Sequence, residues 1–277
     1  MRAIQLGAAS GVLRLSFYEE LRERQPVLAA FSFLLLAAMA PTLIAMAIDA
    51  RLFNGINVWL KPFKFELSTV VHLVTLAWFW PYLDERLRRS ASVRGAAWAI
   101  GLIFVAEVGY IAFRASLAEG SHFNAATPAA AIAYPVMGAA ILVAVGLTAW
   151  IGVLILRSSE GVLAPPVRLA IGLGLIAGSV LGAITGFHMS QQTGHWVGGV
   201  ASDAGGIPLF GWSRSAGDFR VAHFIGLHAM QGIPLVGYLV RQMPAGRTIV
   251  WLTLALWIIA TAATFFQAVQ GRALFPF

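Results

Sequence analysis

The sequence contains no cysteine, and only 11% of its 277 residues are charged. The lack of cysteine excludes disulfides, thiolate metal sites and catalytic thiols. The shortage of charge excludes a soluble globular protein, in which about a quarter of the residues are charged. With 59% apolar residues and a mean hydropathy of +0.78, most of the outer surface must be hydrocarbon. We therefore expect a polytopic membrane protein.

Apolar runs of spanning length predict the fold class, since one span takes about 20 residues. We expect an all-α transmembrane helix bundle that forms a single integral membrane domain over residues 1–277. Residues 1–26 are expected to form an amphipathic cytoplasmic segment, and residues 190–219 a glycine-rich outer loop, long enough to close over a site. Seven spans are predicted, at residues 27–48, 65–82, 95–114, 131–156, 167–189, 220–240 and 248–270.

Basic residues are divided unequally between the two predicted sides of the membrane. The amino terminus and the even-numbered loops carry twelve Lys and Arg residues, and the other side carries seven. Because Lys and Arg accumulate in cytoplasmic loops, this count predicts a cytoplasmic amino terminus. The net charge of +7 is then an orientation signal, and we expect no nucleic-acid partner.

All six histidines fall in outer loops or in the outer halves of predicted spans. His72 and His228 each lie eight residues below a basic residue, which is about 12 Å along a helix, and Glu107 reaches a similar depth. Ionisable groups at that depth are costly unless they are paired or hydrated, so they indicate a functional site inside the bundle. The alternatives are histidines that only hydrogen-bond neighbouring helices, and an ion pair between Glu107 and Arg114.

Neutral imidazoles with a carboxylate form a ligand set for a transition metal such as zinc, copper or iron. We predict a transition-metal-dependent membrane enzyme, a hydrolase or an oxidoreductase, that acts on a lipid-soluble substrate. Glu107 and Ser68 are the candidate catalytic residues, and Ser68 shares a helix face with His72. The candidate metal ligands are His72, His188, His223, His228 and Glu66.

Two histidines at equal depth on different helices also suit bis-imidazole ligation of haem b, with His72 and His228 as ligands. That alternative is an electron-transfer protein linked to haem or quinone. Gly182 and Gly186 belong to a ridge of glycines, one every four residues, that would give a porphyrin room or let another helix approach closely. A proton-coupled transporter is the third alternative, because intramembrane Glu and His also serve as proton relays.

Ser68-x-x-x-His72 on the second of seven spans resembles the motif of the superfamily that contains alkaline ceramidases and progestin/adiponectin-type receptors. This resemblance implies zinc and gives Glu107 the part of the third-span acid, although the HxxxH pattern and a histidine on the last span are missing here. The segments SHFN (121–124) and HFIGLHAMQ (223–231) are similar to bacterial polytopic inner-membrane proteins with no assigned activity. We accordingly expect an inner-membrane protein whose site faces the periplasm, with membrane lipids as partners.

Overall fold

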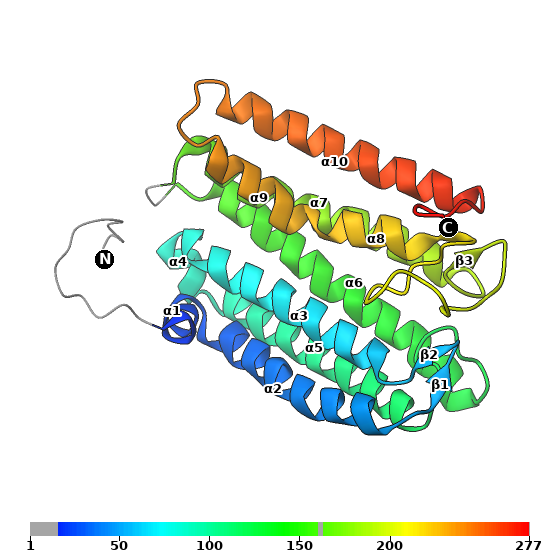
Figure 1. The fold of residues 1–277 in the computed structure, drawn as a ribbon. Helices are drawn as coiled ribbons and strands as arrows, with labels where there is room; N and C mark the ends of the chain where they lie inside the picture. Colours follow the sequence, from blue (N-terminus) through cyan, green and yellow to red (C-terminus); the bar gives the residue numbers. More distant parts are fainter. Residues whose placement is uncertain (1–15, 160–162, 277) are drawn as a thin grey trace.

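The computed structural model describes residues 16–159 and 163–276, most of them in helices (Figure 1). In chain order the elements are α1 (Phe17–Arg24), α2 (Pro26–Ile48), β1 (Leu52–Phe53), β2 (Ile56–Asn57), α3 (Leu60–Phe79), the 3-10 helix η1 (Trp80–Tyr82), α4 (Glu85–Arg89), α5 (Ala91–Ser116), α6 (Pro128–Arg157), α7 (Pro165–Ser190), β3 (Trp196–Val197), β4 (Gly217–Asp218), α8 (Phe219–Leu227), α9 (Ala229–Leu239) and α10 (Gly246–Val269).

Five of these helices, α2, α5, α6, α7 and α10, are long and apolar enough to cross a membrane. The predicted mostly helical membrane fold is therefore confirmed at that level. Of the two remaining predicted spans, one falls on α3, which carries Lys61, Lys64 and Glu66 in its first half. The other falls on α8 and α9, which have only 9 and 11 residues.

The boundaries of two predicted segments differ from the structure. α3 begins at Leu60, five residues before the predicted span, because Pro62 lies in its first turn, where a missing N–H costs no helical hydrogen bond. The predicted amphipathic segment lies partly outside the described residues. Its visible part is α1, which begins at the capping box of Ser16 and Glu19 and buries Leu21.

The predicted span at 220–240 is interrupted at His228, between α8 and α9. The carbonyl oxygen of Ile225, one turn before the break, accepts a hydrogen bond from the indole Nε1 of Trp257 on α10 at 2.7 Å. A side chain that takes over a helical carbonyl in this way is a recognised cause of helix distortion. The sequence pattern alone indicates a continuous helix here.

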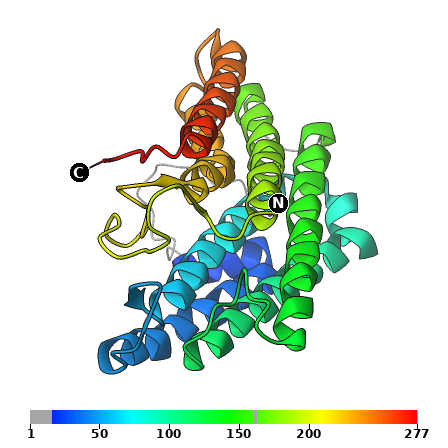
Figure 2. The ribbon, with the colours of Figure 1, turned by 90° about the vertical axis from the view of Figure 1, so that its right-hand side faces the viewer.

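The helices form two groups that α6 joins (Figure 2). One group consists of α2, α3 and α5, and the other of α7, α8, α9 and α10; α6 packs against both α5 and α7. The main core is aliphatic, with Leu73, Ile100, Ile151 and Leu175 fully or almost fully buried. Polar side chains of α3 and α8 lie near the boundary between the two groups.

Both two-stranded sheets lie at one end of the bundle, which we call the loop end, and α1 and α4 lie at the other, which we call the α1 end (Figure 1). At the loop end the long connection between α7 and α8 crosses to the β1–β2 turn. The backbone N–H of Asp203 donates to the carbonyl oxygen of Asn54 at 2.8 Å. Gly55 has a φ of +83° there, and a Cβ on it would lie 2.8 Å from the Cβ of Ala204. The close approach therefore requires glycine.

Candidate functional site

The glycine ridge of α7 is filled by α8 and by the start of α9. A Cβ on Gly178 would lie 2.9 Å from the carbonyl oxygen of Leu227, and one on Gly182 would overlap the Leu227 side chain. A Cβ on Gly186 would lie 3.0 Å from the ring of His223. The space beside Gly182 and Gly186 is thus occupied by protein, which favours the packing alternative, and their role as cofactor contacts stays a prediction. The ridge packs helices together, as small residues do in membranes.

Two of the predicted histidine ligands are fixed by threonine hydroxyls on neighbouring helices. His72 Nε2 lies 3.1 Å from Thr148 Oγ1, and His223 Nδ1 lies 3.1 Å from Thr185 Oγ1. Both hydroxyls donate their own hydrogen to a backbone carbonyl, so they accept from the imidazoles. Nδ1 of His72 and Nε2 of His223 remain as acceptors.

His228 belongs to a polar chain that connects the two helix groups. Its Nδ1 lies 3.1 Å from Oε1 of Gln231, and Nε2 of Gln231 donates to Oγ1 of Thr75 on α3 at 3.1 Å. Thr75 in turn donates to the carbonyl oxygen of Val71, so it can only accept from Gln231. The chain therefore holds His228 with Nδ1 as donor. The histidine that lies at the break in the helix is tied to the opposite group.

The remaining predicted ligands lie elsewhere. The ring of His188 packs edge-on against the rings of Phe219 and Phe265. Glu66 is buried and faces α2, where its Oε1 accepts from Thr42 Oγ1 at 2.7 Å and its Oε2 has no hydrogen-bond partner among the described residues. The predicted ligand set is therefore divided between separate places.

Neither candidate catalytic residue is hydrogen-bonded to a base or a nucleophile among the described residues. Ser68 is exposed on the outside of α3. Glu107 is half-buried on α5, and no hydrogen bond joins it to another described residue. Arg114 forms its ion pair with Glu119, so the alternative in which Glu107 pairs with Arg114 is not found.

In the described part of the chain, no group of three or more His, Asp or Glu side chains is arranged to hold a metal ion. The predicted metal and haem sites gain no support from this arrangement and stay predictions.

The polar groups that the structure does bring together lie at the loop end, in a set that we call the loop-end cluster. Its centre is Arg220, whose Nη2 lies 2.7 Å from Asp203 and 2.6 Å from Asp218. Both carboxylates are buried. Arg220 also donates to the carbonyl oxygen of Gly211 at 2.6 Å. The members of the loop-end cluster are Lys61, Lys64, His195, Asp203, Asp218 and Arg220.

Two lysines add positive charge to this cluster without a carboxylate to neutralise it. Nζ of Lys64 donates to the carbonyl oxygen of Phe210 at 3.1 Å, and no ion pair joins it to a described residue. A Cβ placed on Gly211 would lie 3.5 Å from Nζ of Lys64 and 3.8 Å from Nη1 of Arg220, so the two cations face the same spot. Lys61 has no hydrogen bond to the described residues, and its ammonium lies 5.8 Å from the ring centre of Phe65.

Burial favours the uncharged form of the histidines in the loops at this end. Burial lowers the pKa of His195 from its usual 6.5, although the hydrogen bond between its Nε2 and Asp203 acts in the opposite direction. Burial acts to raise the pKa of Asp203, but the contacts with His195 and Arg220 outweigh it and leave that pKa lowered. Burial and the nearby charge of Lys61 hold the pKa of His122 well below 6.5. The loop end thus favours an ionised Asp203 and neutral His195 and His122.

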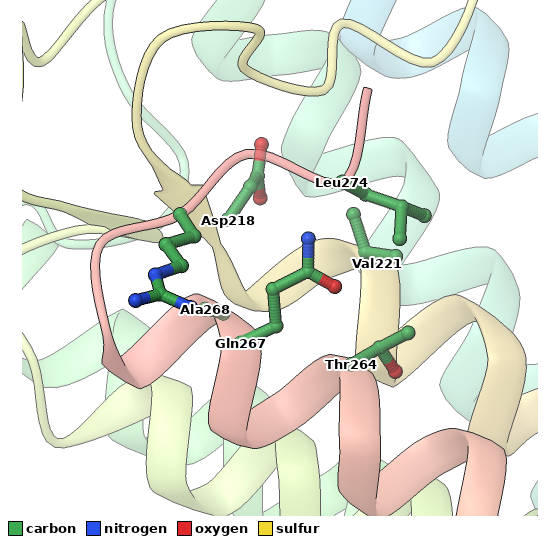
Figure 3. A pocket seen from close by; sticks show the side chains of 7 residues that line it. Asp218, Val221, Thr264, Gln267, Ala268 and Leu274 are labelled. Atoms are coloured by element: carbon green, nitrogen blue, oxygen red, sulfur yellow. The ribbon is translucent and has the colours of Figure 1, made fainter. Parts of the chain in front are cut away.

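A depression next to the cluster, where the C-terminal segment crosses α8 and α10, is too tight to act as a site (Figure 3). Asp218, Val221 and Gln267 line it, and it has no room for a water molecule. Gln267 closes it by donating to the carbonyl oxygen of Ala273 at 2.8 Å. The chemistry of this end therefore lies on the other side of Asp218, around the lysines.

From the sequence, Lys61 and Lys64 are readable as interfacial anchors or as lysines that hold an anionic headgroup, whereas Asp203 and Arg220 were missed as site residues. One signal was present: Lys61 and Lys64 are the only lysines of the chain, which carries 17 arginines. All other basic residues are arginines, and both flexible ammonium groups lie in one place. Lysine and arginine are not equivalent in ion binding. No sequence signal indicated Asp203, because its contact with Arg220 spans the folded loop.

No family model, curated protein or solved structure matches the chain. The two resemblances drawn from short motifs accordingly stay predictions.

Proposed function

We propose that this integral membrane protein binds an anionic, lipid-soluble small molecule at the loop end and exchanges protons with it through the histidines and Glu107. The observation that carries the proposal is the excess of cations in the loop-end cluster. Arg220 engages both carboxylates, which leaves Lys61 and Lys64 without one. Half-buried ammonium groups of this kind gain most from an anion that approaches them.

The proton-exchanging part of the proposal rests on the groups beneath the lysines. Lys61 is within electrostatic range of Glu107, the half-buried carboxyl group of α5. His72, His223 and His228 each have one ring nitrogen engaged by a fixed partner and the other available as acceptor. A carboxyl group and imidazoles held in one tautomer are suited to accept and donate protons. This combination favours a proton-coupled transporter, or an enzyme that works by acid–base catalysis.

The experiment is a titration of the purified protein with dodecyl phosphate, with dodecanol as its uncharged counterpart. Lys61→Gln is the sharpest variant, because it removes a charge without breaking a hydrogen bond to any described residue. Loss of one charge-assisted contact, about 1.5 kcal/mol or more, predicts at least about tenfold weaker binding of dodecyl phosphate. Lys61→Arg keeps the charge and is expected to retain most of the affinity.

Arg247→Gln is the matched control, because it removes one exposed positive charge at the far end of α10. It is expected to bind dodecyl phosphate like the wild type. Equal binding of dodecyl phosphate by the wild type and by Lys61→Gln, or equal binding of dodecanol and dodecyl phosphate, would contradict the proposal.

For the membrane arrangement we propose seven spans, formed by α2, α3, α5, α6, α7, the α8–α9 pair and α10. The amino terminus is then cytoplasmic, and the loop end faces the periplasm of a bacterial inner membrane. The bias of basic residues supports this direction, with twelve on the α1 side and seven on the loop-end side.

A metal-dependent enzyme is the second candidate, because the imidazoles have the partners that metal-ligating histidines have. Each of His195, His223 and His228 has one ring nitrogen held by a carboxylate, a hydroxyl or an amide. About one zinc, copper or iron per chain by elemental analysis would support this candidate, and a Soret band would indicate haem instead. A metal-free, colourless protein that is fully able to bind dodecyl phosphate would exclude both.

A further inference from the structure

The α1 end has a cavity of about 290 Å³ for which the proposed function has no use. It lies where the start of α2 meets η1, α4 and the first turns of α5, far from the loop-end cluster (Figure 1). Its lining includes three arginines and two tryptophans, Arg24, Arg88, Arg94, Trp80 and Trp98. A volume of this size accommodates a polar headgroup.

The positive charge of this cavity is only partly neutralised. Arg24 pairs with Glu20 at 2.9 Å and donates to the carbonyl oxygen of Trp78 at 3.1 Å. Nε of Arg88 is buried, and it has no hydrogen-bond partner among the residues that the structure describes. Arg94 is exposed, and within the same described ranges it forms no ion pair. A buried guanidinium N–H without an acceptor is costly, so this cavity favours an anionic ligand that would accept from it.

The cavity also adjoins the positive end of a helix. Gln25 and Pro26, the N-cap and first residue of α2, lie on its wall. The Gln25 side chain already accepts from the backbone N–H groups of Val27 and Leu28, and α1 ends beside it at Arg24, so this helix end adds little charge. The positive potential inside the cavity therefore comes from the three guanidinium groups.

The two tryptophans place the cavity at the level of a membrane interface. Trp80 is buried, whereas Trp98 is 53% exposed on the outer surface of α5. Tryptophan is enriched where the hydrocarbon region meets the headgroups. Trp98 thus marks a side from which a lipid can reach the arginines with its acyl chains still in the hydrocarbon layer.

We infer that this cavity binds the phosphate of an anionic phospholipid in the membrane leaflet at the α1 end. Guanidinium groups bind phosphate oxygens through paired, charge-assisted hydrogen bonds. Basic pockets between membrane helices at the cytoplasmic side are typical sites for anionic headgroups. In this arrangement Arg88 and Arg94 contact the phosphate, and Arg24 is held beside it by Glu20.

The test uses delipidated, detergent-solubilised full-length protein and native mass spectrometry with phosphatidylglycerol or phosphatidylcholine. We expect phosphatidylglycerol to bind selectively, and Arg88→Gln to weaken its binding about fivefold to tenfold. Arg94→Gln is the second variant, because an exposed side chain is removed without risk to the fold. Arg86→Gln is the matched control: it is exposed on the same short helix, does not line the cavity and is expected to leave binding unchanged.

The results that would overturn the inference are distinct from those for the loop end. If Arg88→Gln and Arg94→Gln both bind phosphatidylglycerol like Arg86→Gln, the arginines of the cavity do not hold the headgroup. Equal binding of the two lipids would show that charge plays no part. If water-soluble glycerol phosphate displaces phosphatidylglycerol at an equal concentration, the ligand is a free phosphate compound and the lipid assignment is wrong.

Discussion

At the scale of single residues, the loop end depends on how three cations share two carboxylates. Arg220 holds Asp203 and Asp218 in short contacts, and the backbone N–H groups of Ser213 and Arg220 also donate to Asp218. Neither carboxylate forms an ion pair with Lys61 or Lys64, so the cluster holds three cations against two anions. Two like charges in a partly desolvated place repel each other more strongly than in water. The residue-level consequence is a preference for a bound anion.

The neutral state of the loop histidines gives the fold a pH dependence. The pKa values of His195 and His122 are lowered from 6.5 in the folded protein, mainly by burial. Between those lowered values and about 6.5 the unfolded chain binds more protons than the folded one, so stability falls as the pH falls through this window. Asp203, whose pKa is lowered from 3.8, adds a further loss only in stronger acid.

We therefore expect the thermal unfolding temperature in detergent to decrease when the pH is lowered from 7.5 to 5. Each histidine can change the free energy of unfolding by at most about 1.4 kcal/mol per pH unit. In the variant with both His122→Gln and His195→Gln, the unfolding temperature is expected to change clearly less with pH over the same range. An unchanged slope in that variant would mean that these imidazoles are not the groups that resist protonation.

At the scale of elements, apolar runs predict where the helices lie but not how they are interrupted. The predicted spans coincide with helices because a long apolar segment has few other stable conformations in hydrocarbon. The break at His228 coincides with a hydrogen bond from Trp257, which lies on another helix, to the carbonyl oxygen of Ile225. A contact of this kind between distant residues leaves no mark in a local pattern.

The glycine ridge of α7 is a second feature that the local sequence pattern predicts only in part. Its spacing predicts one smooth face, and that face exists. Whether a helix or a cofactor occupies it is decided by Leu227 and His223, which reach it from α8. The sequence therefore predicts the shape of the surface, and only the fold shows which neighbour fills it.

At the scale of the whole molecule, the two ends have different chemistry. The loop end carries both lysines, the loop histidines and the long α7–α8 connection. The α1 end carries Arg24, Arg88 and Arg94 around an interfacial cavity. The segregation of all six histidines to one side stays a prediction, because α3 begins at Leu60 and His72, the thirteenth of its 20 residues, lies past the middle of the helix. The loop-end cluster was not predictable, because Lys64 and Phe210 are 146 residues apart in the chain.

The absence of cysteine makes the orientation directly measurable. Ser215→Cys places one thiol at an exposed position of the loop end, and Ser92→Cys places one at the α1 end. In intact bacterial cells a membrane-impermeant maleimide is expected to label Ser215→Cys and to spare Ser92→Cys until the cells are opened. Labelling of Ser92→Cys alone would invert the proposed topology.

The central claim is that Lys61 and Lys64 receive an anion, and protection of these amines tests it most directly. Because they are the only lysines, acetylation by an amine-directed reagent can be followed at both positions by peptide mass spectrometry. We predict that dodecyl phosphate slows the acetylation of Lys61 and Lys64 severalfold, since a bound anion blocks the amines and stabilises their protonated form, and that dodecanol does not. Equal acetylation rates with and without dodecyl phosphate, over concentrations at which it enters the detergent micelle, would contradict the account.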